Sequence, residues 1–555
     1  MQSRNAMPEG GGTLTAHRPV VNSRRGMVAS AHYEASLAGL RMFLQGGNAV
    51  DAVVAAAATL NVVEPFMSGL GGIGFLLISR NYGQERRVLN FSGVVPKGAV
   101  PEAFTPENHS IGVRCPLVPG NPHGWLTMLE AYGTLPRSTV LAPTIELAEK
   151  GFMISQSDNR YYEVNQERLA QFPTSKAAYM PHGHPPKPGE IFKQPDLARS
   201  FRTLADEGLD GFYRGSIARE IDRFMKESDG LINLEDLDAY EPDWETPISI
   251  NYKGYDVVTT GPNSNAFQVL ETLNILEEFD LQGLGHNSAD YIHLLSEAIK
   301  IAVPDRIMYG GDPKYLDVPV SGLLTKDYAK ERRGRINHQR ASTVIGERYT
   351  ENPPPEAITA GSPSVYTSGE TTHFSAADSE GTVATITQTL GAGFGCGVVA
   401  GSTGFLLNNN IDLMDITQGS DSRLLVQPGK RPGSNMAPIQ VFKDGRFLLS
   451  IGTPGSYGIP QTTTQMILNV LEFGMNVQEA IEAPRFRVMT GVTINMEGRI
   501  PPEVRDALVS RGHDIGLLGE WGMEVGGGHA IAVDPETGVL MGGADPRRDG
   551  FALGL

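Results

Sequence analysis

A run of five residues, Thr371–Ser375, places a hydroxyl nucleophile where the chain changes character. The preceding residues 351–370 are rich in proline, serine and threonine, whereas the residues after Thr371 have a β-strand pattern. A threonine that becomes a new chain terminus carries its own α-amine, whose reference pKa of about 7.7 to 8.0 suits a base near neutral pH. Thr371 could then supply both nucleophile and base, although the local pattern alone is explained more simply by a strand-opening threonine.

Other catalytic patterns are weaker. Gly69–Gly74 contains Gly-x-Gly-x-x-Gly, but it follows a predicted helix and precedes a predicted strand, which reverses the context of a dinucleotide site. His182 and His184 lie in a proline-rich loop without carboxylates at ligand spacing. Gly455–Gly458 has the wrong spacing for the nucleophile elbow of a serine hydrolase. We therefore expect neither a cofactor nor a metal.

The overall composition limits the classes of partner. The chain has 555 residues, including 65 glycines, and its 46 basic and 63 acidic residues give a formal net charge of −17. This charge disfavours nucleic-acid binding, and no apolar stretch approaches the roughly 20 residues that span a membrane. Residues 1–25 contain no signal-peptide core, so we expect a cytoplasmic protein with a small-molecule substrate. The two cysteines, Cys115 and Cys396, are too few for a disulfide framework.

The order of the predicted elements indicates one layered body of helices and strands without internal repeats. Helices are expected at Tyr33–Leu44, Ala49–Leu60, Pro195–Asp206, Ser216–Glu227, Ala266–Glu278 and Ser288–Tyr309. Asn48 is expected to cap the second of these helices, and Pro304 to kink or end the last. Strands are expected at Thr372–Asp378, Gly381–Leu390, Gly397–Leu407 and Gln440–Gly452, the first two as a hairpin.

Seven short segments occur in the same order as in one known family. They are Gly46–Ala52, Gly69–Gly72, Phe212–Gly215, Thr371–Ser375, Leu406–Asn409, Lys430–Pro432 and Gly542–Gly550. On these segments the chain, from about Met27 to its C-terminus, resembles the γ-glutamyltranspeptidase family of N-terminal-nucleophile hydrolases. The resemblance implies an α+β fold, a four-layer αββα sandwich, built by both parts of a chain that cuts itself between Glu370 and Thr371.

The same resemblance implies how the chain is divided. Residues 1–26 are expected to be a poorly ordered N-terminal segment, and residues 27–370 a large subunit that ends in a flexible tether. Residues 371–555 are expected to be a small subunit that begins with the nucleophile. The two subunits from one precursor would form a single structural unit, and whether such units dimerise stays open.

Position by position, the resemblance implies a catalytic set. Thr371 matches the nucleophile, and Thr389 matches the threonine that hydrogen-bonds it. Gly455 and Ser456 match the two backbone donors of the oxyanion hole, although the family has a second glycine where this chain has Ser456. Backbone donors tolerate that change if the turn keeps its shape.

A second set is expected to bind substrate. Ser434 and Asn435 match a Ser-Ser pair that contacts the substrate carboxylate, so the second position is altered. Asn410 ends an asparagine run that borders the site. Gly391 stands where the family has an asparagine contact, two residues past Thr389.

The residues that grip a γ-glutamyl head group in the family are changed here. Ser92 replaces the arginine that binds the α-carboxylate, and Leu413 replaces the acid that binds the α-amine. Asp412 or Asp415 could supply the acid after a local shift, and Arg114 is a candidate for the missing cation. Loss of both contacts in a desolvated site would cost on the order of 2 to 5 kcal/mol each.

These departures predict an autoprocessing threonine amidohydrolase or acyltransferase that acts on a small or dicarboxylic acyl group other than γ-glutamyl. One alternative is a γ-glutamyltransferase or glutathione hydrolase with a rewired clamp. The other is a catalytically silent scaffold, against which the retained threonines and the Gly452–Gly455 turn argue. The sequence does not decide between hydrolysis and transfer.

Overall fold

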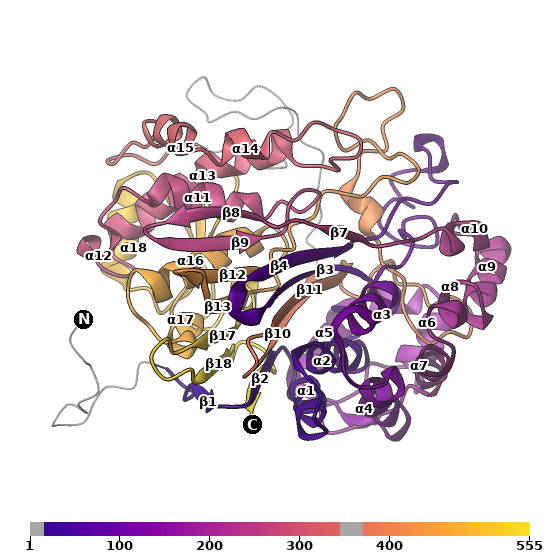
Figure 1. Ribbon diagram of the computed structural model, residues 1–555. Helices are drawn as coiled ribbons and strands as arrows, with labels where there is room; N and C mark the ends of the chain where they lie inside the picture. Colours follow the sequence, from indigo (N-terminus) through magenta and orange to yellow (C-terminus); the bar gives the residue numbers. More distant parts are fainter. Residues whose placement is uncertain (1–15, 344–369) are drawn as a thin grey trace.

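The computed structural model describes residues 16–343 and 370–555. Two seven-stranded sheets lie face to face, and helices cover the outer face of each, which gives four layers (Figure 1). The expected αββα sandwich is confirmed.

Every strand pairing within the two large sheets is antiparallel. The first sheet, in spatial order, consists of β1 (Val21–Ser23), β18 (Leu540–Ala544), β17 (His529–Val533), β13 (Arg446–Gly452), β12 (Ile439–Lys443), β9 (Tyr255–Thr259) and β8 (Ile248–Tyr252). The second consists of β19 (Phe551–Gly554), β2 (Gly26–Ser30), β10 (Glu370–Asp378), β11 (Val383–Gly391), β3 (Ile73–Arg80), β4 (Glu85–Phe91) and β7 (Asp243–Glu245). Two small sheets are formed by β14 (Phe486–Val488), β15 (Thr493–Met496) and β16 (Asp514–Leu517), and by β5 (Phe152–Met153) and β6 (Ile191–Phe192).

The helices divide between the two outer layers by their place in the chain (Figure 1). Beside the second sheet are α1 (Tyr33–Leu44), α2 (Ala49–Val63), α3 (Asn121–Tyr132), α4 (Arg137–Lys150), α5 (Gln156–Ala170), α6 (Pro173–Tyr179), α7 (Pro195–Glu207), α8 (Leu209–Tyr213), α9 (Ser216–Ser228) and α10 (Leu234–Asp238). On the side of the first are α11 (Phe267–Leu276), α12 (Leu281–Leu284), α13 (Ala289–Tyr309), α14 (Val320–Leu323), α15 (Lys326–Arg333), α16 (Gly458–Leu471), α17 (Val477–Glu482) and α18 (Pro502–Ser510).

Three apolar cores hold the layers together. One packs α1 and α2 against the outer face of the second sheet, and another packs α11, α13 and α16 against the first sheet. The third lies between the sheets, where Leu77, Phe442 and Ile531 are buried. Because burial of apolar area contributes roughly 25 cal/mol per Å², these cores fix the spacing of the sheets that carry the site.

The β10–β11 hairpin lies in the middle of the second sheet. Thr371 at the start of β10 lies opposite Thr389 near the end of β11. On its other edge β10 pairs with β2, and β11 pairs with β3. Strands from before and after the expected cut are thus neighbours in one sheet, so the two predicted subunits would stay interlocked.

Helix α2 supports this hairpin and begins as expected. The Asn48 side chain accepts hydrogen bonds from the amides at the start of α2, and the Asn48 amide donates to the Asp51 carboxylate at 2.9 Å. Asp51 is fully buried and also accepts bonds from the Thr134 hydroxyl at 2.6 Å and the Leu135 amide at 3.1 Å. The start of α2 is therefore tied to the connection between α3 and α4.

One expected strand is wrong. Residues 397–407 form turns, because Gly397, Gly401 and Gly404 have φ values of 82°, 59° and 76°. This left-handed region suits glycine and interrupts an extended strand every three or four residues.

Three further expectations need correction. The expected strand 440–452 is divided into β12 and β13 by a turn in which Asp444 and Gly445 have φ values of 52° and 75°. Pro304, expected to kink or end its helix, does not end α13, which continues to Tyr309; a kink there stays a prediction. The segment expected to be poorly ordered up to residue 26 includes β1, which pairs with β18.

Residues 1–15 and 344–369 lie outside the described residues. The second range contains the expected tether except for its last residue, Glu370. Among the helices of the described residues, none has the length and apolar character needed to cross a membrane.

Replacement of Asp51 by alanine should destabilise the protein by about 2 to 4 kcal/mol, because several buried amide and hydroxyl donors lose their acceptor at once. Thermal unfolding followed by circular dichroism measures the change. The exposed Asp506 on α18 is the matched control, and its change to alanine should alter stability by less than about 0.5 kcal/mol. An equal effect of the two substitutions would contradict the role of Asp51.

Candidate active site

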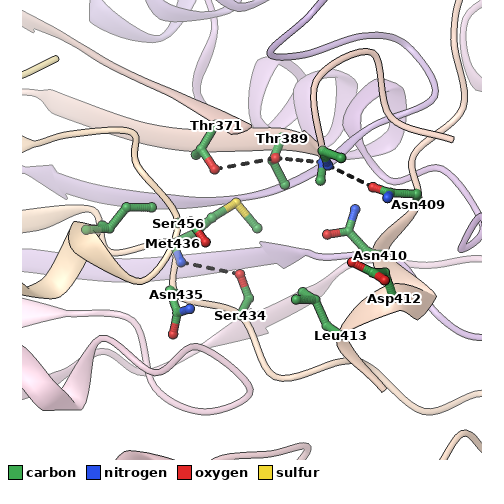
Figure 2. Close-up of a pocket in the computed structure, with 13 residues that line it drawn as sticks. Thr371, Thr389, Asn409, Asn410, Asp412, Leu413, Ser434, Asn435, Met436 and Ser456 are labelled. Atoms are coloured by element: carbon green, nitrogen blue, oxygen red, sulfur yellow. Dashed lines mark hydrogen bonds between the residues drawn. The ribbon is translucent and has the colours of Figure 1, made fainter. Parts of the chain in front are cut away.

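A pocket lies where β10 begins and β11 ends, and the residues around it come from distant parts of the chain (Figure 2). It is lined by Thr371, Thr389, Gly391, Ala392, Asn409, Asn410, Asp412, Leu413, Ser434, Asn435, Met436, Ser456 and Ile459. Seven of the residues expected from the sequence to act in one site are therefore together.

A chain of hydrogen bonds starts at Thr371. Its Oγ1 donates to Thr389 Oγ1 at 3.4 Å, and the Thr389 hydroxyl donates to the carbonyl oxygen of Glu370. The amide of Gly391 donates to Thr389 Oγ1 at 2.8 Å and fixes its position (Figure 2). The hydrogen bond from Thr389 polarises the Glu370 carbonyl, which belongs to the peptide bond between Glu370 and Thr371. A polarised carbonyl is what a nucleophilic attack on this peptide bond would need.

Thr371, the expected nucleophile, makes no hydrogen bond to a side-chain base among the described residues. Asp412 is the sole titratable side chain among the described residues that line it. His373 is fully buried and outside the lining, and burial lowers its pKa well below the ordinary value. An α-amine created at Thr371 would fill this missing role.

The turn between β13 and α16 offers backbone donors. Gly455 and Ser456 have φ values of 131° and 55°. Neither amide donates a hydrogen bond to another residue within 16–343 or 370–555. Thr453 Oγ1 holds the turn by accepting from the Gly527 amide at 2.9 Å. Two N–H groups are therefore available to stabilise an oxyanion. The positive φ of Ser456 strains the backbone, as is common at functional sites.

The glycine-rich loop before β3 supports the opposite wall rather than a nucleotide. A Cβ atom on Gly71 would lie 2.2 Å from the Leu406 carbonyl oxygen, so a side chain there would collide with backbone. Asn408 donates to the Gly71 carbonyl at 2.9 Å, and Asn409 accepts from the Ala392 amide at 2.8 Å. The asparagine run is therefore held by backbone contacts on both sides.

The wall formed by residues 434–436 is held from α13. Asn435 Oδ1 accepts from Asn265 at 3.1 Å and from Arg306 Nη1 at 3.2 Å. Arg306 is a residue that sequence reasoning missed, because nothing in the spacing connects α13 with Asn435. The amide of Met436 donates to Ser434 Oγ at 3.3 Å.

Two expected substrate contacts lie elsewhere. Ser92 is fully buried, and its hydroxyl donates to Asn90 at 2.7 Å and accepts from Asn263 at 3.1 Å. Arg114 pairs with Asp229 and lines a separate cavity, so it does not replace the missing arginine of the pocket. The polar groups of Ser92 and Arg114 thus bind neighbouring residues of the fold and do not reach the pocket.

Two groups of side chains come close enough to suggest a metal. They are His293 with Glu297 and His513, and His32 with Asp158 and Asp549. In the first group the two imidazoles share a hydrogen bond of 2.8 Å, and Lys300 pairs with the carboxylate at 2.9 Å. In the second group His32 Nδ1 accepts a hydrogen bond from the Glu34 amide, so the proton of the neutral imidazole is on Nε2. Neither group fits a metal well.

Comparisons with known proteins place similar proteins over nearly the whole chain. The Gamma-glutamyltranspeptidase family model matches residues 35–555. The glutathione hydrolase proenzyme of Bacillus subtilis strain 168 is 34% identical, with 97% of this chain and 93% of that protein aligned. The acylase ACY 1 proenzyme of Pseudomonas sp. strain SE83 is 36% identical, with 98% and 96% aligned. The crystal structure of cephalosporin acylase from Bacillus halodurans has a TM-score of 0.89 at 31% identity and covers 100% of this chain and 99% of its own.

Two substitutions test the hydrogen-bond chain. Thr371→Ala should leave a single uncleaved chain, because no hydroxyl remains to attack Glu370. Thr389→Ala should slow self-cleavage at least about 100-fold, the usual effect of losing one donor to a developing oxyanion. Denaturing gels over time measure the uncleaved fraction. Thr203→Ala on α7 is the control, and cleavage of Thr371→Ala at the normal rate would refute the assignment.

Proposed function

The chain belongs to the γ-glutamyltranspeptidase family and is an amidohydrolase, and we propose that it cuts itself before Thr371 and then works through an acyl-enzyme on that residue. The observation that carries this proposal is the chain of hydrogen bonds from Thr371 through Thr389 to the Glu370 carbonyl, in a pocket where Asp412 is the sole titratable side chain among the described lining residues. A silent scaffold would have no use for it.

Self-cleavage would proceed in two steps. Thr371 Oγ1 attacks the Glu370 carbonyl carbon and the C–N bond breaks, which leaves an ester on Oγ1 and a free α-amine on Thr371. Water then hydrolyses the ester, so residue 370 ends one chain and Thr371 begins the other. The Thr389 hydroxyl stabilises the negative charge that develops on the carbonyl oxygen.

Turnover would repeat the attack on a substrate amide. The α-amine takes the proton from Thr371 Oγ1, which bonds to the substrate carbonyl carbon. The amides of Gly455 and Ser456 stabilise the oxyanion, and the proton passes to the departing amine. Water, or an acceptor amine, resolves the ester and frees the hydroxyl.

The pocket suggests an acyl group other than γ-glutamyl. Leu413 presents an apolar side chain where the family has the acid that binds the α-amine, and a dicarboxylic acyl group such as glutaryl lacks that amine. Ser92 is buried away from the pocket and none of the described lining residues is basic, so a small acyl group without a carboxylate also fits. We therefore infer a small or dicarboxylic acyl group. The similarity to proteins named acylases supports this choice.

A second candidate is a γ-glutamyl hydrolase or transferase with a rewired clamp. Asp412 lines the pocket and could attract the α-ammonium, while Arg306 supports Asn435 from behind. This arrangement would be a new solution to the same recognition problem.

Two chromogenic amides separate the candidates. Glutaryl-p-nitroanilide and γ-glutamyl-p-nitroanilide differ by one amino group, and we expect kcat/KM to favour the glutaryl compound at least about 10-fold, since 1.4 kcal/mol corresponds to that factor. Thr371→Ala serves as the inactive control. Faster release from the γ-glutamyl compound would establish the second candidate instead.

A further inference from the structure

Two arginines flank the residue that precedes the nucleophile. Arg548 has a side chain only 5% exposed, and its Nη2 lies 4.0 Å from Glu370 Oε2. Arg487 on β14 also acts on this carboxylate: burial raises the pKa of Glu370, and the charges of Arg548 and Arg487 oppose that shift. In the uncleaved chain, therefore, the Glu370 carboxylate lies 4.0 Å from Arg548 and is also attracted by the charge of Arg487. We call these two arginines and the space around the Glu370 carboxylate the arginine recess.

The recess borders the oxyanion turn. A Cβ atom on Gly458 would lie 2.6 Å from Arg487 Nε, so this guanidinium packs against the first residue of α16. Arg548 packs in the same way against Gly527, whose amide holds Thr453 of the turn. The recess and the turn thus share their supporting residues.

The recess is separate from the pocket described above. Neither Arg487 nor Arg548 belongs to the residues that line the pocket. A substrate whose acyl group enters the pocket and whose carbonyl oxygen meets the turn must send its nitrogen away from the pocket. The arginine recess borders the turn and lies outside the pocket lining, so it is placed to receive the amine portion.

Both guanidinium groups retain binding capacity. Arg487 Nε and Arg548 Nε are buried and have no hydrogen-bond partner among the described residues. The nearby Glu64 does not take the place of Glu370, because burial raises its pKa to about 8 against the attraction of Arg548. Buried guanidinium groups bind carboxylates strongly, and leaving them without an anion is costly.

Self-cleavage changes the occupancy of this recess. Hydrolysis of the bond before Thr371 makes Glu370 the last residue of its chain, attached covalently on one side only, so its side-chain carboxylate can be displaced by another carboxylate. This step rests on the proposed function. We propose that in the cleaved enzyme Arg487 and Arg548 form a subsite for a carboxylate carried by the amine portion of the substrate, either the departing amine or an acceptor amine such as an amino acid or short peptide.

Kinetics with a matched pair of substrates test the subsite. Glutaryl-anilide and glutaryl-4-carboxyanilide share the acyl group and differ by one carboxylate on the amine. Arg487→Gln should raise KM for the carboxyanilide at least about 10-fold with little change in kcat, and should change KM for the anilide less than about threefold. Arg487→Lys should restore part of the difference. Arg446→Gln, at the exposed first residue of β13, is the control, and equal effects on both substrates would overturn the proposal.

Transfer identifies the source of the carboxylate. With glutaryl-anilide as donor, glycylglycine and glycinamide are compared as acceptors. Loss of the preference for glycylglycine in Arg487→Gln assigns the subsite to the acceptor, whereas an effect on KM of the carboxyanilide alone assigns it to the departing amine. If neither preference depends on Arg487, the subsite does not exist.

A binding experiment works without turnover and so separates this proposal from the proposed function. In uncleaved Thr371→Ala, Glu370 still occupies the recess. Adding Glu370→Gln should strengthen binding of 4-aminobenzoate at least about 10-fold by isothermal titration, and a further Arg487→Gln should abolish the gain. Unchanged affinity would reject the subsite even if self-cleavage and hydrolysis are both observed.

Discussion

The geometry of the pocket depends on the register of the β10–β11 hairpin. Thr371 lies opposite Thr389 at the open end of β10 and β11, and this pairing aims one hydroxyl at the other and the second at the Glu370 carbonyl. A shift by one residue would turn both side chains to the other face of the sheet. The register is secured by β2 and β3 on its two edges and by the buried contacts of α2 beneath it.

The same constraint explains why cleavage need not disturb the fold. Both edges of the hairpin pair with strands from before the cut, and the first sheet likewise mixes strands from both parts. Breaking one peptide bond at a strand end removes little of this burial. In the proposed mechanism it would change the chemistry instead, because it would create an amine at Thr371 and loosen the Glu370 carboxylate from the arginine recess.

Local signals predicted the parts of the structure that depend on local physics. The hairpin, the Asn48 cap and the helical spacing of α1 follow from residues close in sequence. The strand expected at 397–407 failed because glycine permits positive φ without requiring it, so its turns cannot be read from composition.

The composition of the site was harder to predict. Motif resemblance found seven residues of the pocket, but Arg114 proved to belong to another cavity. Arg306 lies about 130 residues from Asn435, and Arg487 and Arg548 lie far from Glu370 in the sequence, so their contacts arise only from tertiary packing. Among the 65 glycines, Gly71, Gly458 and Gly527 stand where backbone or arginine side chains approach too closely for a Cβ atom.

The central claim is that Thr371 becomes a chain terminus and carries the acyl group. Acid quenching during turnover of glutaryl-p-nitroanilide, followed by mass spectrometry of the intact chains and their peptides, tests it most directly. The expected result is a fragment of residues 371–555 with a glutaryl adduct confined to the peptide that begins at Thr371. A single chain of 555 residues, or an adduct on any other peptide, would contradict it.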